Sequence, residues 1–224
     1  MGIILVVFAV ALLIMMVAYV FHQKRERTAS LRAHAEASGY DFEPEVFDSL
    51  ETRYAGVGLF GRGRNRHGSN LMKFREGELR FRMFDYSFYE GTRSNESHRT
   101  FSVVLAETGW RLRRLQVRPE GFLDGLAKLV GAEDLQLDSV EFNQRFLVET
   151  PHPGWATELL HPKMMDYLLQ APPCTIEIVG DTVVFYVNYH LDSPGYLLYL
   201  AHLKKFIRLI PEELRVDPHA EPSD

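Results

Sequence analysis

The feature that most constrains this chain is an unbroken apolar run from Ile3 to Phe21, "IILVVFAVALLIMMVAYVF". The first 21 residues contain no Lys, Arg, Asp or Glu. An α-helix rises about 1.5 Å per residue, so about 20 residues cross the hydrocarbon core of a bilayer, which is about 30 Å thick. We therefore predict a transmembrane anchor over residues 1–22, with Tyr19 near the interface, where amphipathic rings are favoured.

A cleaved signal peptide is the alternative interpretation of this run. Such a peptide has a basic segment, then an apolar core of about 7–15 residues, then a small-x-small cleavage site. Here no basic side chain precedes the run, the run is longer, and "MVA" at residues 16–18 matches the cleavage pattern poorly. These differences favour a retained helix.

Positive charge follows the apolar run and predicts its orientation. The segment "HQKRERTASLR" holds one acidic and four basic residues, the latter being Lys24, Arg25, Arg27 and Arg32. Because Lys and Arg near a membrane helix stay on the cytoplasmic side, we expect an outside N-terminus and a cytoplasmic domain at the inner membrane. The single cysteine, Cys174, cannot form an internal disulfide, which suits a reducing compartment.

Beyond the anchor, we predict three further segments. Residues 23–54 form a juxtamembrane helix and connector, in which Thr28 is a candidate N-cap and Gly39 a helix stop. Residues 55–210 form one soluble domain. Residues 211–224, "PEELRVDPHAEPSD", carry five acids, one arginine and three prolines, so we expect a disordered acidic tail.

The soluble domain shows mostly strand patterns in its first half. The apolar parity changes between Met83 and Phe84, which indicates either a β-bulge or a strand buried on both faces. The predicted elements are strands over 78–90, 98–107, 111–120 and 140–150, and a hairpin around Gly180 over 174–189. The Arg-rich segment 59–74 is predicted as a loop.

Helical patterns lie mainly in the second half, over 120–132, over 153–170 with a break at Pro162, and over 195–214. Short loops join successive predicted strands, and the strand–helix alternation that a parallel sheet needs does not occur. We therefore predict an α+β fold: a mainly antiparallel sheet with helices packed on it, behind one transmembrane helix.

Four segments of the chain resemble a family of uncharacterised bacterial membrane-anchored proteins. They are "MFDYSFYEG", "VRPEGFLDGLAKLVG", "EFNQRFLVET" and "LLHPKMMDYLLQAPP". The resemblance covers roughly residues 55–190, and the segments are moderately specific as a set. It implies this architecture and no assigned activity, and it supplies no site residues.

The segment "LFGRGRNRHGSNLMKF", residues 59–74, places Arg62, Arg64 and Arg66 on alternate positions. It lacks the G-x-x-x-x-G-K-[ST] pattern of a P-loop. Four interpretations stay open: a solvated loop that keeps a sheet edge clear, a lipid-headgroup contact, a protein-binding surface, and an RNA arm.

Charge distribution favours the membrane among the functional interpretations. Residues 24–118 carry 18 Lys and Arg against 13 Asp and Glu, a net charge of +5, whereas residues 119–224 carry 7 against 17, a net charge of −10. A basic membrane-proximal half suits an anionic leaflet, and an acidic distal half argues against nucleic acid. The candidate lipid-headgroup contacts are Lys24, Arg25, Arg27, Arg62, Arg64 and Arg66.

Catalytic and metal signatures are absent from the sequence. There is no H-E-x-x-H, paired-Cys or G-x-S-x-G motif, so we predict no metal, no cofactor and no catalytic residues. We interpret "HLDSPG" (190–195) as a turn capped by Asp192 and Ser193, and Cys174 as a small buried residue. We expect Asp85 to face the interior and pair with an arginine; it could form a carboxylate pair with Glu141 only if the fold joins them.

These observations predict a non-catalytic binding or scaffold module at the cytoplasmic leaflet. Its partners would be anionic lipid headgroups or an unidentified protein. The alternative is an enzyme of unrecognised type that acts on a membrane-associated substrate. That alternative requires a pocket with convergent polar groups and an acid or histidine of perturbed pKa.

Overall fold

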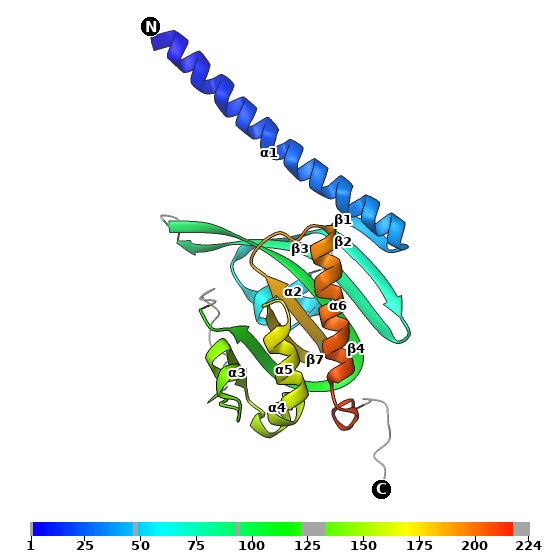
Figure 1. Cartoon of the computed structure of the whole chain (residues 1–224). Coiled ribbons are helices and arrows are strands. Elements are labelled where there is room, and N and C mark those ends of the chain that lie inside the picture. The colour runs from blue at the N-terminus through cyan, green and yellow to red at the C-terminus, as the bar shows by residue number, and fades with distance from the viewer. Residues whose placement is uncertain (1, 47–48, 93–94, 122–132, 217–224) are drawn as a thin grey trace.

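The computed structural model describes residues 2–46, 49–92, 95–121 and 133–216. It is an α+β structure: a seven-stranded antiparallel sheet with helices on its faces and one long N-terminal helix, as predicted (Figure 1). The strand order is β1-β2-β3-β4-β6-β5, and β7 also pairs with β4.

The strands are β1 (Asp41–Val46), β2 (Arg64–Glu76), β3 (Leu79–Thr92), β4 (Asn95–Pro119), β5 (Glu133–Asp134), β6 (Phe146–Thr150) and β7 (Thr175–Val187). The α-helices are α1 (Gly2–Ser38), α2 (Leu50–Arg53), α3 (Val140–Arg145), α4 (Pro153–Leu159), α5 (Pro162–Gln170) and α6 (Ser193–Leu209). Two 3-10 turns, η1 (Gly58–Gly61) and η2 (Glu212–Leu214), complete the described elements.

Helix α1 has an exposed apolar half and a half that packs on the domain. Large apolar side chains from Val6 to Phe21 are exposed, and the helix is long and apolar enough to cross a membrane. Leu31 and Ala35, further along, are buried in the core. We had predicted that Thr28 caps the start of a new helix. This was wrong, because α1 is continuous through Thr28. Gly39, with φ 70°, follows the last turn.

The sheet is buried on both faces at its centre, which explains the parity change in β3. Phe81 and Met83 belong to a core shared with α1 and helices α3 to α6. Phe84, Tyr86 and Phe88 belong to a second core, under α2 and η1. The register between β3 and β4 is continuous from Arg80↔Glu107 to Thr92↔Asn95, so β3 contains no bulge against β4 and the second of our two interpretations is confirmed.

Strands β4 and β7 are each one long strand, and here the predictions were wrong. We predicted separate strands over 98–107 and 111–120, and a hairpin around Gly180. Instead each is one strand, and the two pair from Ser102↔Val187 to Val117↔Ile176, with a register shift between Glu107 and Leu112, where Leu112 faces Gly180. Gly109 and Gly180 both have positive φ (75° and 60°), so each marks a bend that two neighbouring strands share.

The Arg-rich segment is also not a loop, because residues 64–76 form β2 between β1 and β3. Two register shifts fall on β2, beside Asn65 and Asn70, which have φ of 51° and 55°. Asparagine adopts this backbone conformation more readily than most residues, which explains its use at both irregularities. These shifts hide the strand pattern from a sequence-based prediction.

The second half of the chain matches the predictions more closely. Pro162 separates α4 from α5, and Asp192 N-caps α6 by accepting a hydrogen bond from Gly195 N at 2.9 Å. Residues 140–145 form α3 rather than the start of a strand, and Ser139 caps that helix. The predicted helix over 120–132 falls largely on residues outside the described part. In the predicted tail, residues 212–214 form η2, whose Leu214 is buried.

Candidate functional site

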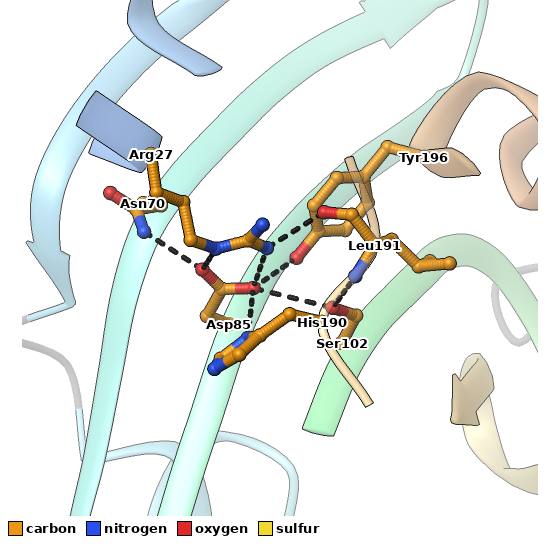
Figure 2. A network of polar contacts seen from close by, with 7 residues as sticks. All are labelled: Arg27, Asn70, Asp85, Ser102, His190, Leu191 and Tyr196. Atoms are coloured by element: carbon orange, nitrogen blue, oxygen red, sulfur yellow. Dashed lines mark hydrogen bonds and ion pairs between the residues drawn. The ribbon is translucent and has the colours of Figure 1, made fainter. Parts of the chain in front are cut away.

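Asp85 lies at the centre of a polar cluster where α1 meets the sheet (Figure 2). Its side chain alternates with those of Phe84 and Tyr86 along β3, so it points to the face that α1 and α6 cover. The residue is only 4% exposed. We call the set that surrounds it the Asp85 cluster; it consists of Arg27, Asn70, Asp85, Ser102, His190, Leu191 and Tyr196.

Arg27 joins α1 to this cluster with two charge-assisted hydrogen bonds. Its Nε donates to Asp85 Oδ2 at 2.9 Å, and its Nη2 donates to Asp85 Oδ1 at 2.7 Å. The same Nη2 also donates to the Leu191 carbonyl at 2.7 Å. A bidentate guanidinium–carboxylate pair fixes orientation as well as distance. Arg27 therefore clamps the helix to two separate parts of the domain, and the expected pairing of Asp85 with an arginine is confirmed.

Four other side chains contact the Asp85 carboxylate. Asn70 Nδ2 donates to Oδ2 at 2.8 Å, from the β2 position where the register shifts. Tyr196 Oη, on α6, donates to Oδ1 at 2.8 Å, and Ser102 Oγ, on β4, donates to it at 3.3 Å. His190 Nδ1 lies 3.4 Å from the same oxygen. The cluster thus ties α1, three elements of the domain core and the connection before α6 to one carboxylate.

Ser102 extends the cluster to the backbone. Its Oγ accepts a hydrogen bond from Leu191 N at 2.9 Å, while Leu191 O accepts from Arg27. Both backbone groups of Leu191 are therefore bonded inside the cluster, which fixes the turn that precedes α6.

The chemistry of Asp85 is that of an ion-pair anchor. Burial by itself raises the pKa of its carboxyl, but hydrogen bonds from His190 and Arg27, together with the charge of Arg27, outweigh burial and hold the pKa well below its usual range. A general base works best with a pKa near the operating pH and with a free lone pair toward its substrate. Asp85 has a low pKa and six donor contacts, so it suits structure better than proton transfer.

Two clefts lie on the two sides of α1, where the helix crosses the sheet. One has a volume of about 550 Å³ and is lined by Val20 and Lys24, by His67 and His98, and by four members of the Asp85 cluster: Arg27, Asn70, Asp85 and His190. The other has a volume of about 580 Å³ and is lined by Phe21, Lys24, Arg25 and Arg32 against Pro44, Glu45 and His67. Both clefts begin at the last residues of the apolar run, and Lys24 borders both.

The six predicted lipid-headgroup contacts therefore fall into two groups. Lys24 and Arg25 line the clefts beside α1, next to the end of the apolar run. Arg27 reaches the 550 Å³ cleft, but its guanidinium is bonded to Asp85.

The other three arginines, at the end of η1 and the start of β2, are each paired with a glutamate. Arg62 Nη2 lies 2.7 Å from Glu90 Oε1, and its guanidinium stacks over Phe88. Arg64 pairs with Glu96, and Arg66 Nη2 lies 3.3 Å from Glu51 Oε1. The fold thus does not bring these arginines to the clefts where Lys24 and Arg25 lie, and a lipid contact for any of the six remains a prediction.

Two other residues named in the sequence analysis, Cys174 and Glu141, lie outside the Asp85 cluster. Cys174 is buried, as predicted, and burial raises the pKa of its thiol. Glu141 is exposed on α3, whereas Asp85 is buried in β3. The contacts of Asp85 given above do not include Glu141, so the two do not form a carboxylate pair. Among the residues that the structure describes, no group of three His, Cys, Asp or Glu could hold a metal ion.

The sequence analysis missed Asn70, Ser102 and Tyr196 as members of the cluster. Ser102 carried a weak signal, since it is a polar residue inside an otherwise apolar strand segment, whereas Asn70 follows Gly68 and Ser69 and carried none. Tyr196 carried none, because a tyrosine on the apolar stripe of a helix is an ordinary core residue.

Fold and cluster together define a class: an α+β domain carried by a long N-terminal helix, to which it is clamped by a buried ion pair. No family model matches the chain, and no curated protein matches it. Among solved structures, the chain is similar to the mycobacterial trehalose monomycolate transport factor A, TtfA, with a TM-score of 0.61 and 13% sequence identity. The match covers 84% of this chain and 97% of that one. At this identity the similarity concerns the fold alone.

Proposed function

We propose that the chain is a single-pass, membrane-anchored binding or scaffold module that acts without catalysis at the cytoplasmic leaflet. The observation that carries the proposal is the clamp between Arg27 and Asp85. A flexible tether would leave the domain free to rotate, whereas a bidentate buried pair, with Leu31 and Ala35 packed beside it, holds the domain at one angle to the helix. A fixed angle is useful to a module that must present one surface at the membrane.

The likeness to TtfA supports the same proposal. That protein's name describes a transport factor for trehalose monomycolate. A domain of this fold behind a membrane anchor fits an accessory part of a transport process, in which binding and positioning matter and bond-making does not. The uncharacterised bacterial membrane-anchored family that the sequence resembles is compatible with such a role.

We further propose that Lys24 and Arg25 contact anionic headgroups. They line the clefts beside the end of the apolar run, as Arg27 does, but the guanidinium of Arg27 is bonded to Asp85. Each basic residue near an anionic leaflet contributes about 1 kcal/mol, an attraction that salt weakens within a Debye length. The arginines at 62, 64 and 66 already have glutamate partners, so their share in this contact is smaller.

The enzyme alternative rests on the 550 Å³ cleft, which has convergent polar groups and an acid of perturbed pKa. This cleft therefore has the two features that we required of an enzyme site. We favour the non-catalytic role because the shift in the pKa of Asp85 is downward and its oxygens are already occupied by donors. An enzyme would need another residue of the cleft as its acid or base.

A lipid-dependence experiment tests the proposal. Because Cys174 is buried, a cysteine introduced at the exposed His98 can be labelled alone with an environment-sensitive fluorophore. We expect the emission of the full chain in nanodiscs to shift when phosphatidylglycerol replaces neutral lipid, to reverse in high salt, and to shift less in a Lys24→Gln/Arg25→Gln variant.

The control label is at Lys163, which is exposed on α5 in the acidic half, and should not respond. A Lys163→Gln/Lys205→Gln variant matches the charge change and should respond as the unmodified chain does. Equal emission from position 98 in neutral and anionic nanodiscs would rule out the headgroup contact.

A further inference from the structure

A third cleft, of about 320 Å³, is strongly basic. It lies on the face of the sheet that carries α2, because Arg82 and Asp85 are an odd number of residues apart along β3 and point to opposite faces. We call it the basic cleft; its cationic side chains are Arg53, Lys73, Arg75, Arg80 and Arg82, and Asp41 is the acidic residue that lines it.

Like charges face each other directly in the basic cleft. In the ladder between β2 and β3, Lys73 pairs with Arg82, and Arg75 pairs with Arg80. Directly opposite like charges destabilise an antiparallel pair. Two such pairs side by side break a local rule of sheet stability, and natural proteins break such rules mainly at functional sites.

A buried carboxylate holds part of this charge in place. Glu107, on β4, is 5% exposed. Arg80 Nε lies 2.7 Å from Glu107 Oε2, Arg53 Nη2 lies 3.2 Å from Oε1, and Arg82 Nε lies 3.8 Å from Oε1. Tyr54 Oη donates to the same Oε1 at 2.8 Å. One carboxylate thus positions three guanidinium groups whose charge it cannot neutralise.

The other two carboxylates at the basic cleft do not remove its excess of positive charge. Glu43 pairs with Lys73, and Asp41 lines the cleft. Within the described part of the chain, Arg75 has no carboxylate partner. Five cations and three described carboxylates therefore meet at the cleft, and the side chain of Arg80 is 48% exposed, so its outer donors are open to a ligand.

We propose that the basic cleft binds the phosphate or pyrophosphate group of an anionic ligand. The planar, forked donors of arginine match phosphate oxygens in pairs, and the arginines are already held by Glu107, so little ordering is needed on binding. A dianion also relieves the repulsion between Arg75 and Arg80. The volume of about 320 Å³ is large enough for a phosphate group with a small substituent. This inference is independent of the proposed function.

Titration of the detergent-solubilised full chain with inorganic pyrophosphate, at constant ionic strength, tests the proposal. We expect the melting temperature to rise with pyrophosphate, and Arg75→Gln and Arg80→Gln each to weaken binding at least about tenfold. Arg113→Gln removes an equal charge from an exposed position of β4 and should bind as the unmodified chain does. No binding to the unmodified chain, or equal binding to all three variants, overturns the proposal.

A charge reversal gives an independent readout. Arg75→Glu places opposite charges across from each other at Arg80, so the melting temperature without ligand should rise while the response to pyrophosphate disappears. A variant that is destabilised, or that still responds, contradicts the like-charge argument.

The phosphate group could belong to a soluble molecule or to a lipid headgroup, and the two sources are separable. If phosphatidic acid in the micelle removes the response to pyrophosphate, the cleft accepts headgroups. If the response is unchanged, the ligand is soluble. Failure of pyrophosphate and phosphatidic acid alike overturns the proposal and leaves the anchored module untouched.

Discussion

At the scale of single residues, Asp85 does more than any other side chain to join the parts of the molecule. It is a buried charge whose cost of desolvation is offset by a bidentate arginine and by donors from four other residues. A buried pair adds little net stability over an apolar replacement, but removing one partner leaves an uncompensated charge. We expect its value to be specificity, because the pair fixes one position of α1 against β3.

Asp85→Asn should therefore cost about 2–4 kcal/mol of the free energy of unfolding, slightly less than for a fully buried pair because Arg27 is 22% exposed. Chemical denaturation of the solubilised full chain measures this loss in the free energy of unfolding. Glu96→Gln breaks the exposed pair with Arg64 and should cost less than about 1 kcal/mol. Similar small losses in both variants would mean that the clamp is not a structural element.

His202 gives the stability a pH dependence. Burial on α6, against Phe185 and Tyr167, lowers the pKa of its imidazole to about 4. The unfolded chain, with an ordinary histidine pKa of about 6.5, binds the proton more readily, so this contribution is present above pH 6.5 and is lost as the pH falls toward 4. We expect a loss of roughly 2–3 kcal/mol across that window.

The comparison is with His202→Phe, which lacks the titrating group. Its free energy of unfolding should be lower at neutral pH, because Tyr167 loses a partner, and should change less between pH 6.5 and pH 4. Parallel curves for the two proteins over that range would show that His202 is not the cause.

At the scale of elements, the long pair of β4 and β7 decides the shape of the sheet. Each strand bends at a glycine of positive φ, and the bend lets β4 pair with β3 and β6 at different points along its length. The two strands resume pairing beyond the register shift, so the separate breaks that the sequence suggested near Gly109 and Gly180 form one bend of a strand pair.

Gly180→Ala should lower the free energy of unfolding by about 1 kcal/mol, because a side chain disfavours φ of +60° although a Cβ there would meet no atom within 4 Å. Gly154→Ala is the matched control: it is equally open, but lies in α4 with helical backbone, and should cost nothing or stabilise. Thermal melts of both variants distinguish backbone strain from crowding. Equal effects would contradict the assignment.

At the scale of the whole molecule, α1 is one continuous helix with two different halves. Its exposed apolar half fits a bilayer, and its second half is part of the domain core. The basic cluster after the apolar run predicts a cytoplasmic domain. A protease should therefore cut a C-terminal tag in inverted membrane vesicles and leave it intact in whole cells. Cleavage in whole cells would reverse the orientation and with it the proposed site of action.

Local sequence patterns determined the long apolar helix, the α+β class, the break at Pro162 and the pairing of Asp85 with an arginine. Each of these follows from residues that are neighbours in the chain, or from a charge in an apolar strand that must find a partner.

Only the tertiary structure decided that residues 28–38 continue the anchor helix, that residues 64–76 form a strand, and that Arg27 is the partner of Asp85. These outcomes depend on contacts over long sequence separations: Leu31 is held by the core, Asn70 by Asp85, and Gly180 by Leu112 on β4. Local propensity is worth a few tenths of a kcal/mol per residue, and packing and buried pairs outweigh it. The sequence therefore indicates which residues need partners, and the tertiary structure determines which partners they have.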